Sequence, residues 1–137
     1  MKIDWHIPTS EWDAMKADGR GWEILIPDWL PMAMNELIRN SWNTYMGERR
    51  WIQSYLSQNC RDIPPAMGKR AVQMLVVKGT GNLDDEPNLD GRSKATIDAM
   101  VKLKLLRDDN VKWLQWHHVS QVAGPFQKGL VIRLWDV

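Results

Sequence analysis

Cysteine is nearly absent from this chain, which holds Cys60 and no other. A lone cysteine cannot form a disulfide within the chain, and such scarcity is typical of proteins of the reducing cytoplasm. No general base stands near Cys60 in the sequence, so we do not expect a nucleophilic thiol. Long apolar runs are also missing, so we expect neither a signal segment nor a membrane span. These shortages together favour a cytoplasmic protein.

Phenylalanine and tyrosine are scarce as well, with one and two copies against nine tryptophans. Tryptophan contributes a large apolar area and one hydrogen-bond donor, so most of the nine are expected to pack in the core or at an interface. Stacking on unpaired nucleotide bases is the alternative role for some of them.

The length of 137 residues predicts one ordinary domain with its own core. Apolar patterning predicts a mixed α/β domain, with one mixed sheet and helices packed on it. The expected strands are residues 22–26, 70–78, 111–119 and 130–135, the last two forming a hairpin around Gly124 and Pro125. The expected helices are residues 34–58, which Gly47 would divide, and 90–106.

Residues 1–20 are polar and mixed, with a short helix predicted from Ser10. We interpret them as an N-terminal arm that precedes the main domain, residues 21–137. His6 in this arm is expected to face solvent. His117 and His118 fall in a predicted strand, where neighbouring side chains point to opposite faces, so we do not expect them to bind one metal ion together.

The net charge of +1 is uninformative, but the charges are segregated. Six of the 17 acidic residues lie within residues 84–90 and 108–109, whereas residues 37–78 hold seven basic residues and two acidic ones. An acidic cluster with basic surroundings suits a metal site that faces a phosphate backbone. The predicted DNA-contacting residues are Arg39, Arg49, Arg50, Lys69 and Arg70.

Clustered carboxylates with a nearby lysine are what metal-dependent phosphodiester hydrolysis requires, because carboxylates hold Mg²⁺ and a lysine stabilises charge on the phosphate. Asp90 precedes Lys94 by four residues, which places both on one face of the predicted helix. Asp109 follows that helix. The fifteen residues from Lys94 to Asp109 would span roughly 20 Å if all were helical, so the chain must reverse direction to bring Asp109 to Lys94.

At these residues the sequence resembles the RusA family of Holliday junction resolvases. The resemblance rests on Asn88-Leu89, on Lys94, on Asp98-Ala99-Met100 and on the pair Asp108-Asp109, and it extends upstream to Pro31 and Asn35. The family's Asp-x-Asp before Asn-Leu is not intact here. Alignment on Asn88 places Asp85 at the first Asp and Pro87 at the second, whereas alignment on Lys94 places Asp90 at the second.

The resemblance implies a Mg²⁺-dependent endonuclease that acts as a homodimer on four-way DNA junctions in recombination or repair, with Mn²⁺ as a substitute metal, encoded in many cases by a phage or prophage. It implies Lys94, Asp90 and Asp109 as catalytic residues. The implied metal ligands are Asp85, Asp90, Asp108 and Asp109. Of the two acids in the loop before Lys94, which we call the loop acids, Asp90 is favoured and Asp85 is second.

Two alternatives remain open from the sequence. The chain could bind branched DNA without cutting it, since one carboxylate of the family pattern is displaced. It could also be an unrelated α/β protein with an acidic surface loop. In that case Asp98 pairs with Lys94 or Lys102 along the helix, and Asp108-Asp109 is a polar turn.

Overall fold

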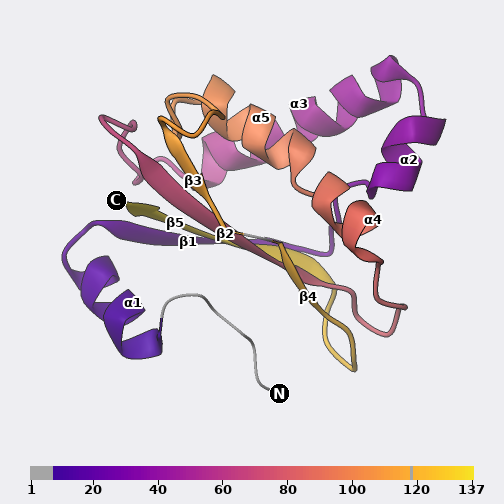
Figure 1. Ribbon diagram of the computed structural model, residues 1–137, viewed down its shortest axis with the longest axis horizontal. Coiled ribbons are helices and arrows are strands. Elements are labelled where there is room, and N and C mark those ends of the chain that lie inside the picture. The colour runs from indigo at the N-terminus through magenta and orange to yellow at the C-terminus, as the bar shows by residue number, and fades with distance from the viewer. Residues whose placement is uncertain (1–7, 118) are drawn as a thin grey trace.

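The computed structural model describes residues 8–117 and 119–137 (Figure 1). In this part of the chain five strands form one sheet in the order β1-β5-β2-β3, with β4 also paired to β2. The strands are β1 (Gly21–Pro27), β2 (Arg70–Val77), β3 (Leu114–Trp116), β4 (Ser120–Val122) and β5 (Gly129–Asp136). β1 and β2 each run antiparallel to β5, whereas β3 and β4 run parallel to β2. The predicted mixed sheet in an α and β domain is confirmed.

The predicted hairpin of the last two strands is wrong. Within the expected strand 111–119 only residues 114–116 form a strand, β3, and a second short strand, β4, follows at residues 120–122. β5 then crosses to the other side of β2, so that Val76 pairs with Gln121 on one side and with Leu130 on the other. β2 can occupy this central position because it is buried along nearly all of its length.

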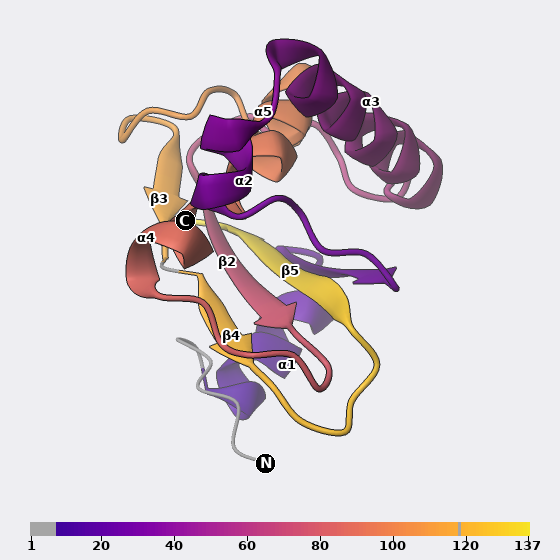
Figure 2. The ribbon, with the colours of Figure 1, turned by 90° about the vertical axis from the view of Figure 1, so that its right-hand side faces the viewer.

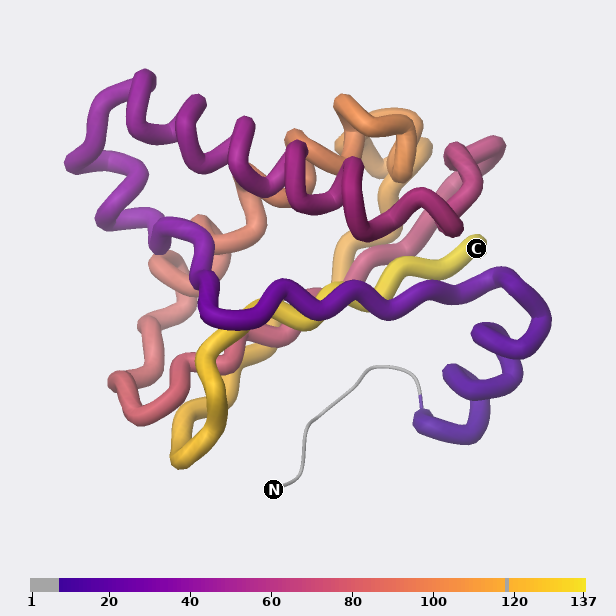
Figure 3. Tube along the Cα trace, turned by 180° about the vertical axis from the view of Figure 1, so that it is seen from behind, coloured from indigo at the N-terminus to yellow at the C-terminus, as the bar shows by residue number. Residues whose placement is uncertain are grey.

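The helices cover both faces of the sheet, as Figures 1 and 3 show. On one face lie α2 (Met34–Arg39), α3 (Trp42–Asn59), α4 (Glu86–Gly91) and α5 (Lys94–Lys102). The core forms where α3 and α5 meet alternate strand residues, with Ile52 and Met100 against Met74 and Ile132, all four at 0% exposure. No helix in residues 8–117 or 119–137 is long and apolar enough to cross a membrane.

The helix predicted from Ser10 is confirmed as α1 (Thr9–Ala17), and it packs on the opposite face of the sheet. Trp12, 1% exposed, and Met15 form a second apolar cluster there with Ala71 and Trp135. The division of the chain at residue 20 stays a prediction, and His6 and His118 lie outside the described residues.

Both long predicted helices are divided in the structure. Residues 34–58 break at Asn40 and Ser41, not at Gly47, because Asn40 donates to the Glu36 carbonyl and the Ser41 hydroxyl accepts from the Thr44 amide as the cap of α3. The predicted helix 90–106 breaks between Gly91 and Lys94 and ends at Lys102.

Candidate active site

A pocket of about 270 Å³ opens beside the first turn of α5 and the segment that leads into β3. Its lining includes Lys94 and Asp98 from α5 and Asp109 from the segment after the helix, together with Ser93, Ile97, Leu114 and Trp116. Two of the predicted catalytic residues, Lys94 and Asp109, therefore meet at one pocket. Asp98, which is part of the resemblance and for which the alternative was a helix-stabilising pair, is the third charged residue of this pocket.

Asp109 reaches the pocket because the chain reverses just after α5. Lys104 adopts a left-handed conformation with φ of 68°, and the Leu105 amide donates back to the Met100 carbonyl at 2.9 Å. This is the usual geometry of a helix end that turns sharply. Leu105 and Leu106 then enter the core at 4% and 0% exposure, which fixes the returning chain against the domain.

The Asp98 carboxylate is held from two sides. The Tyr45 hydroxyl of α3 donates a short hydrogen bond to it. Lys94 Nζ lies 3.7 Å from its Oδ2 and 5.4 Å from the centre of the Tyr45 ring. Burial, followed by the hydrogen bond and the negative charge of Asp98, raises the pKa of Tyr45 well above its usual value of 10.0. Tyr45 therefore stays protonated and donates to Asp98 at all physiological pH values.

The loop acids lie outside this pocket. Asp85 caps α4, accepting from the Asn88 amide at 3.1 Å, and its side chain is exposed. Asp90 is exposed near the end of α4, where its carbonyl accepts from the Ser93 hydroxyl. The prediction that Asp90 and Lys94 share one helix face is wrong, because residues 92–93 form a turn between α4 and α5.

Asp108 and Asp84 are also engaged elsewhere. Asp108 Oδ1 accepts the Asp109 amide at 2.8 Å and does not line the pocket. Asp84 pairs with Arg92 at 2.5 Å and with Lys78 at 2.9 Å. Hydrogen bonding to Arg92, with help from Lys78, lowers the pKa of Asp84 below its usual value although burial opposes this.

The described residues contain no group of three or more His, Cys, Asp or Glu side chains arranged to hold a metal ion. Mg²⁺ is commonly held by one or two carboxylates and completes its shell with water and phosphate oxygens. Asp98 and Asp109 suit this requirement in number and chemistry. They are the residues that could bind such an ion together with a phosphate.

The predicted DNA-contacting residues differ in their surroundings. Arg39 and Arg50 are exposed, and Arg49 and Lys69 are partly exposed. Arg49 lies close enough to Tyr45 for its charge to oppose part of the rise in the pKa of that hydroxyl, which burial chiefly causes. Arg70 is different: it is 2% exposed, and its guanidinium donates to Asp136 and to the Leu105 carbonyl. We therefore correct its role from DNA contact to a structural tie across the sheet.

Cys60 is 6% exposed at the end of α3, and burial raises the pKa of its thiol to about 11. A thiol that stays protonated at neutral pH is a poor nucleophile. His117 follows β3 instead of lying in a strand, and its ring stacks on Trp135 at 5.1 Å.

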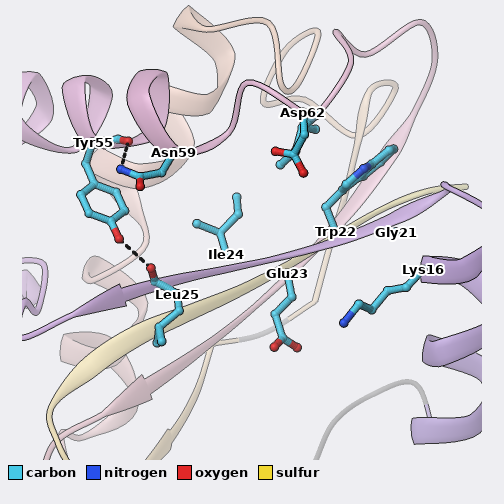
Figure 4. A pocket seen from close by; sticks show the side chains of 10 residues that line it. Lys16, Gly21, Trp22, Glu23, Ile24, Leu25, Tyr55, Asn59 and Asp62 are labelled. Carbon is cyan, nitrogen blue, oxygen red and sulfur yellow. Dashed lines mark hydrogen bonds between the residues drawn. The ribbon is translucent and has the colours of Figure 1, made fainter.

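A larger pocket, of about 590 Å³, lies between β1 and the last turns of α3 (Figure 4). Tyr55 closes one side, with its hydroxyl donating to the Leu25 carbonyl at 2.8 Å. Lys16, Glu23 and Asp62 line other parts of it. None of the predicted catalytic or metal-binding residues lies there, so we assign the chemistry to the smaller pocket.

Tyr45 was not predicted as a site residue, because the apolar spacing of its helix assigned it only to the buried side. The signal available for Asp98 was its four-residue spacing from Lys94, which predicted their pairing but not their position at a pocket. No model of a known protein family matches the chain, and no curated protein matches it.

Proposed function

We propose that this chain is a metal-dependent endonuclease that cuts branched DNA, with the four-way junction as its substrate and with the RusA-like resolvases as its functional analogy. The observation that carries the proposal is the meeting of Lys94, Asp98 and Asp109 at one pocket. A cation site beside an amine is the arrangement that phosphodiester hydrolysis needs.

Asp98 and Asp109 would hold Mg²⁺, which when bound lowers the pKa of a coordinated water and neutralises charge on the phosphate. The Lys94 amine would contact a phosphate oxygen and stabilise the charge that develops there. Tyr45 would keep the Asp98 carboxylate in place through its hydrogen bond. The Lys94 side chain lines the pocket and is 54% exposed, so a DNA strand could reach it from solvent.

The upstream residues of the resemblance, Pro31 and Asn35, lie in contact with the segment before Lys94, which supports the same proposal. The Asn35 amide at the start of α2 donates to Asn88 Oδ1 of α4 at 2.8 Å. Arg92 donates to the carbonyl of Pro31. Figure 2 shows α2 and α4 side by side. The upstream segment and the loop before Lys94, 53 residues apart at Asn35 and Asn88, thus form one surface.

A second candidate function is binding of branched DNA without cleavage. The observation in its favour is that the pocket is lined by two carboxylates, while Asp85 and Asp90 lie outside it. If two carboxylates hold the metal too weakly, binding through the basic residues would remain.

The test is cleavage of a synthetic four-way junction in Mg²⁺, repeated in Mn²⁺, with a matched pair of variants. We expect Asp109→Asn to reduce the cleavage rate at least 100-fold and leave binding intact, because removal of one charged group at such a site costs several kcal/mol of transition-state stabilisation. Asp108→Asn, one residue away and outside the pocket, should cut within a few-fold of the wild-type rate.

Lys94→Ala should also lose cleavage, whereas Lys102→Ala at the other end of α5 should retain it. Tight junction binding with no cleavage in either metal would favour the binding-only function. Absence of binding to any branched DNA at low salt would exclude both functions. We further propose a homodimer, since two symmetric nicks call for two sites related by a two-fold axis.

A further inference from the structure

The first residue of α3 is a tryptophan that points largely into solvent. Trp42 is 68% exposed, the highest exposure of any tryptophan in residues 8–117 and 119–137. Its ring lies beside Tyr45, at 5.3 Å between ring centres with the planes tilted by 37°. Leaving so much indole surface in water is unfavourable, so a partner that covers it would gain binding free energy.

Trp51, on the same helix, shows the opposite arrangement. It is 45% exposed, and it stacks on Trp29 at 4.9 Å and on Tyr55 at 5.6 Å. These two neighbouring rings take up part of its aromatic surface. Trp42 differs because its contact with Tyr45 is tilted and most of its surface is accessible.

Trp42 is connected to the candidate active site through Tyr45. The Tyr45 ring contacts Trp42, its hydroxyl binds Asp98, and Lys94 Nζ lies 5.4 Å from the ring centre. An aromatic surface thus stands one side chain away from the amine and carboxylate of the pocket.

Basic residues lie on both sides of Trp42 along the chain. Arg39 lies three residues before it at the end of α2, Arg49 lies two turns further along α3 near Tyr45, and Lys94 is half-exposed. The first turn of α3 contains no acidic residue. Aromatic rings with interspersed cations are characteristic of surfaces that bind single-stranded nucleic acid, where the cations meet phosphates and the rings meet bases.

We propose that Trp42 stacks on an unpaired nucleobase of the DNA, at the branch point, while the adjoining phosphate meets Lys94. This inference rests on the proposed function and adds a positioning residue to it. A base held on Trp42 would set which phosphate enters the pocket.

The experiment uses a branched DNA with 2-aminopurine as an unpaired base at the branch point, mixed with the protein without divalent cation. Stacking quenches the fluorescence of this base. We expect the wild type to quench it, and Trp42→Ala to bind about tenfold more weakly with the quenching lost, since an aromatic platform contributes about that much for each base. Trp42→Phe should retain most of both signals.

Met67→Ala is the control, because Met67 is 86% exposed in the loop that joins the last turn of α3 to β2, whereas Trp42 is the first residue of α3. It should bind and quench like the wild type. Equal melting temperatures of all variants would show that the fold is intact. With Trp42→Ala, wild-type affinity and quenching would overturn the inference and leave the proposed function standing.

Two further outcomes would also overturn it. If sedimentation shows a wild-type dimer that Trp42→Ala dissociates without loss of quenching, a second copy of the chain covers this ring. If the wild type binds no branched DNA at low salt, the proposed function fails and the inference fails with it.

Discussion

Arg92 shows how one side chain can organise a loop. It is 7% exposed in the turn between α4 and α5, and it binds both Asp84 oxygens and the Pro31 carbonyl. Lys78 completes the cluster from the end of β2. The Asp84 side chain is 12% exposed and paired with two cations, and removing one partner of such an ion pair is costly. The cluster therefore stabilises the conformation of the loop of residues 79–85.

Asp84→Asn should therefore lower the free energy of unfolding by about 3 kcal/mol at pH 7. The pKa of Asp84 is lower in the folded chain than its usual 3.8, so the stabilisation is complete above that value and is lost as the pH falls through the folded-state pKa. Urea unfolding at pH 7 and at pH 3 would measure both effects, and the gap between variant and wild type should narrow at pH 3.

Asp85→Asn is the matched control, because asparagine caps a helix about as well as aspartate. Its stability should stay within about 0.5 kcal/mol of the wild type. Two results would contradict the structural role of this cluster. One is an equal free energy of unfolding for Asp84→Asn and the wild type at pH 7, and the other is a difference between them that is as large at pH 3 as at pH 7.

Among the helices, α2 and α4 pack unusually closely at Gly91. A Cβ atom at this position would lie 2.4 Å from the Met34 backbone nitrogen and 2.6 Å from its Cα. Backbone atoms cannot move aside as a side-chain end can, so the two helices would have to separate. The Asn35 to Asn88 hydrogen bond spans the same contact.

Gly91→Ala should therefore destabilise the fold by about 2 kcal/mol. Gly47→Ala provides the contrast, since Gly47 lies inside α3 and a Cβ atom added there would have nothing within 4 Å. This variant should gain up to about 1 kcal/mol from better helix propensity. Thermal unfolding of both variants would measure these changes, and a Gly91→Ala variant as stable as the wild type would refute the close contact.

The helices also show what local sequence can predict. The apolar spacing within residues 34–58 and 90–106 located helical segments, because burial of one face leaves a periodic pattern. The breaks were missed for separate reasons. Asn40 and Ser41 act through side-chain caps. The separate helix α4 begins at Glu86, before the predicted start at residue 90, with Pro87 in its first turn, where proline is tolerated.

The site was predicted in part for the same reasons. Lys94 and Asp109 were identified from residue type and spacing, and the need for a chain reversal followed from helix length. The position of this reversal could not be predicted, because it occurs at Lys104, and lysine carries no preference for a left-handed conformation. The partner of Asp98 lies 53 residues away at Tyr45, a contact that no local pattern encodes.

For the whole molecule, α1 closes a face of the sheet that the other helices leave open. Trp12 packs edge-on against Trp135 at 5.9 Å, and the Arg133 guanidinium lies 4.8 Å from its ring centre. Glu23 binds Arg133 at 2.9 Å on the same face. The sheet is therefore covered on both sides, which suits strands as fully buried as β2.

Trp12→Ala should consequently cost about 3 kcal/mol or more, as expected for a large core side chain. Trp42→Ala, which removes an exposed ring of the same kind, should change stability by less than about 0.5 kcal/mol. Guanidinium unfolding of both variants would make the comparison. Equal stability of Trp12→Ala and the wild type would show that residues 1–20 are an arm that the main domain does not need.

The central position of β5 has a consequence for synthesis of the chain. Within the described residues β1 has no partner other than β5, which also pairs along the full length of β2. A growing chain therefore leaves the ribosome with β1 unpaired, and with β2 lacking its partner on one side, until residues 129–136 have emerged. The sheet can close only after translation has passed that strand, and until then both apolar strands are open to chaperones or to aggregation.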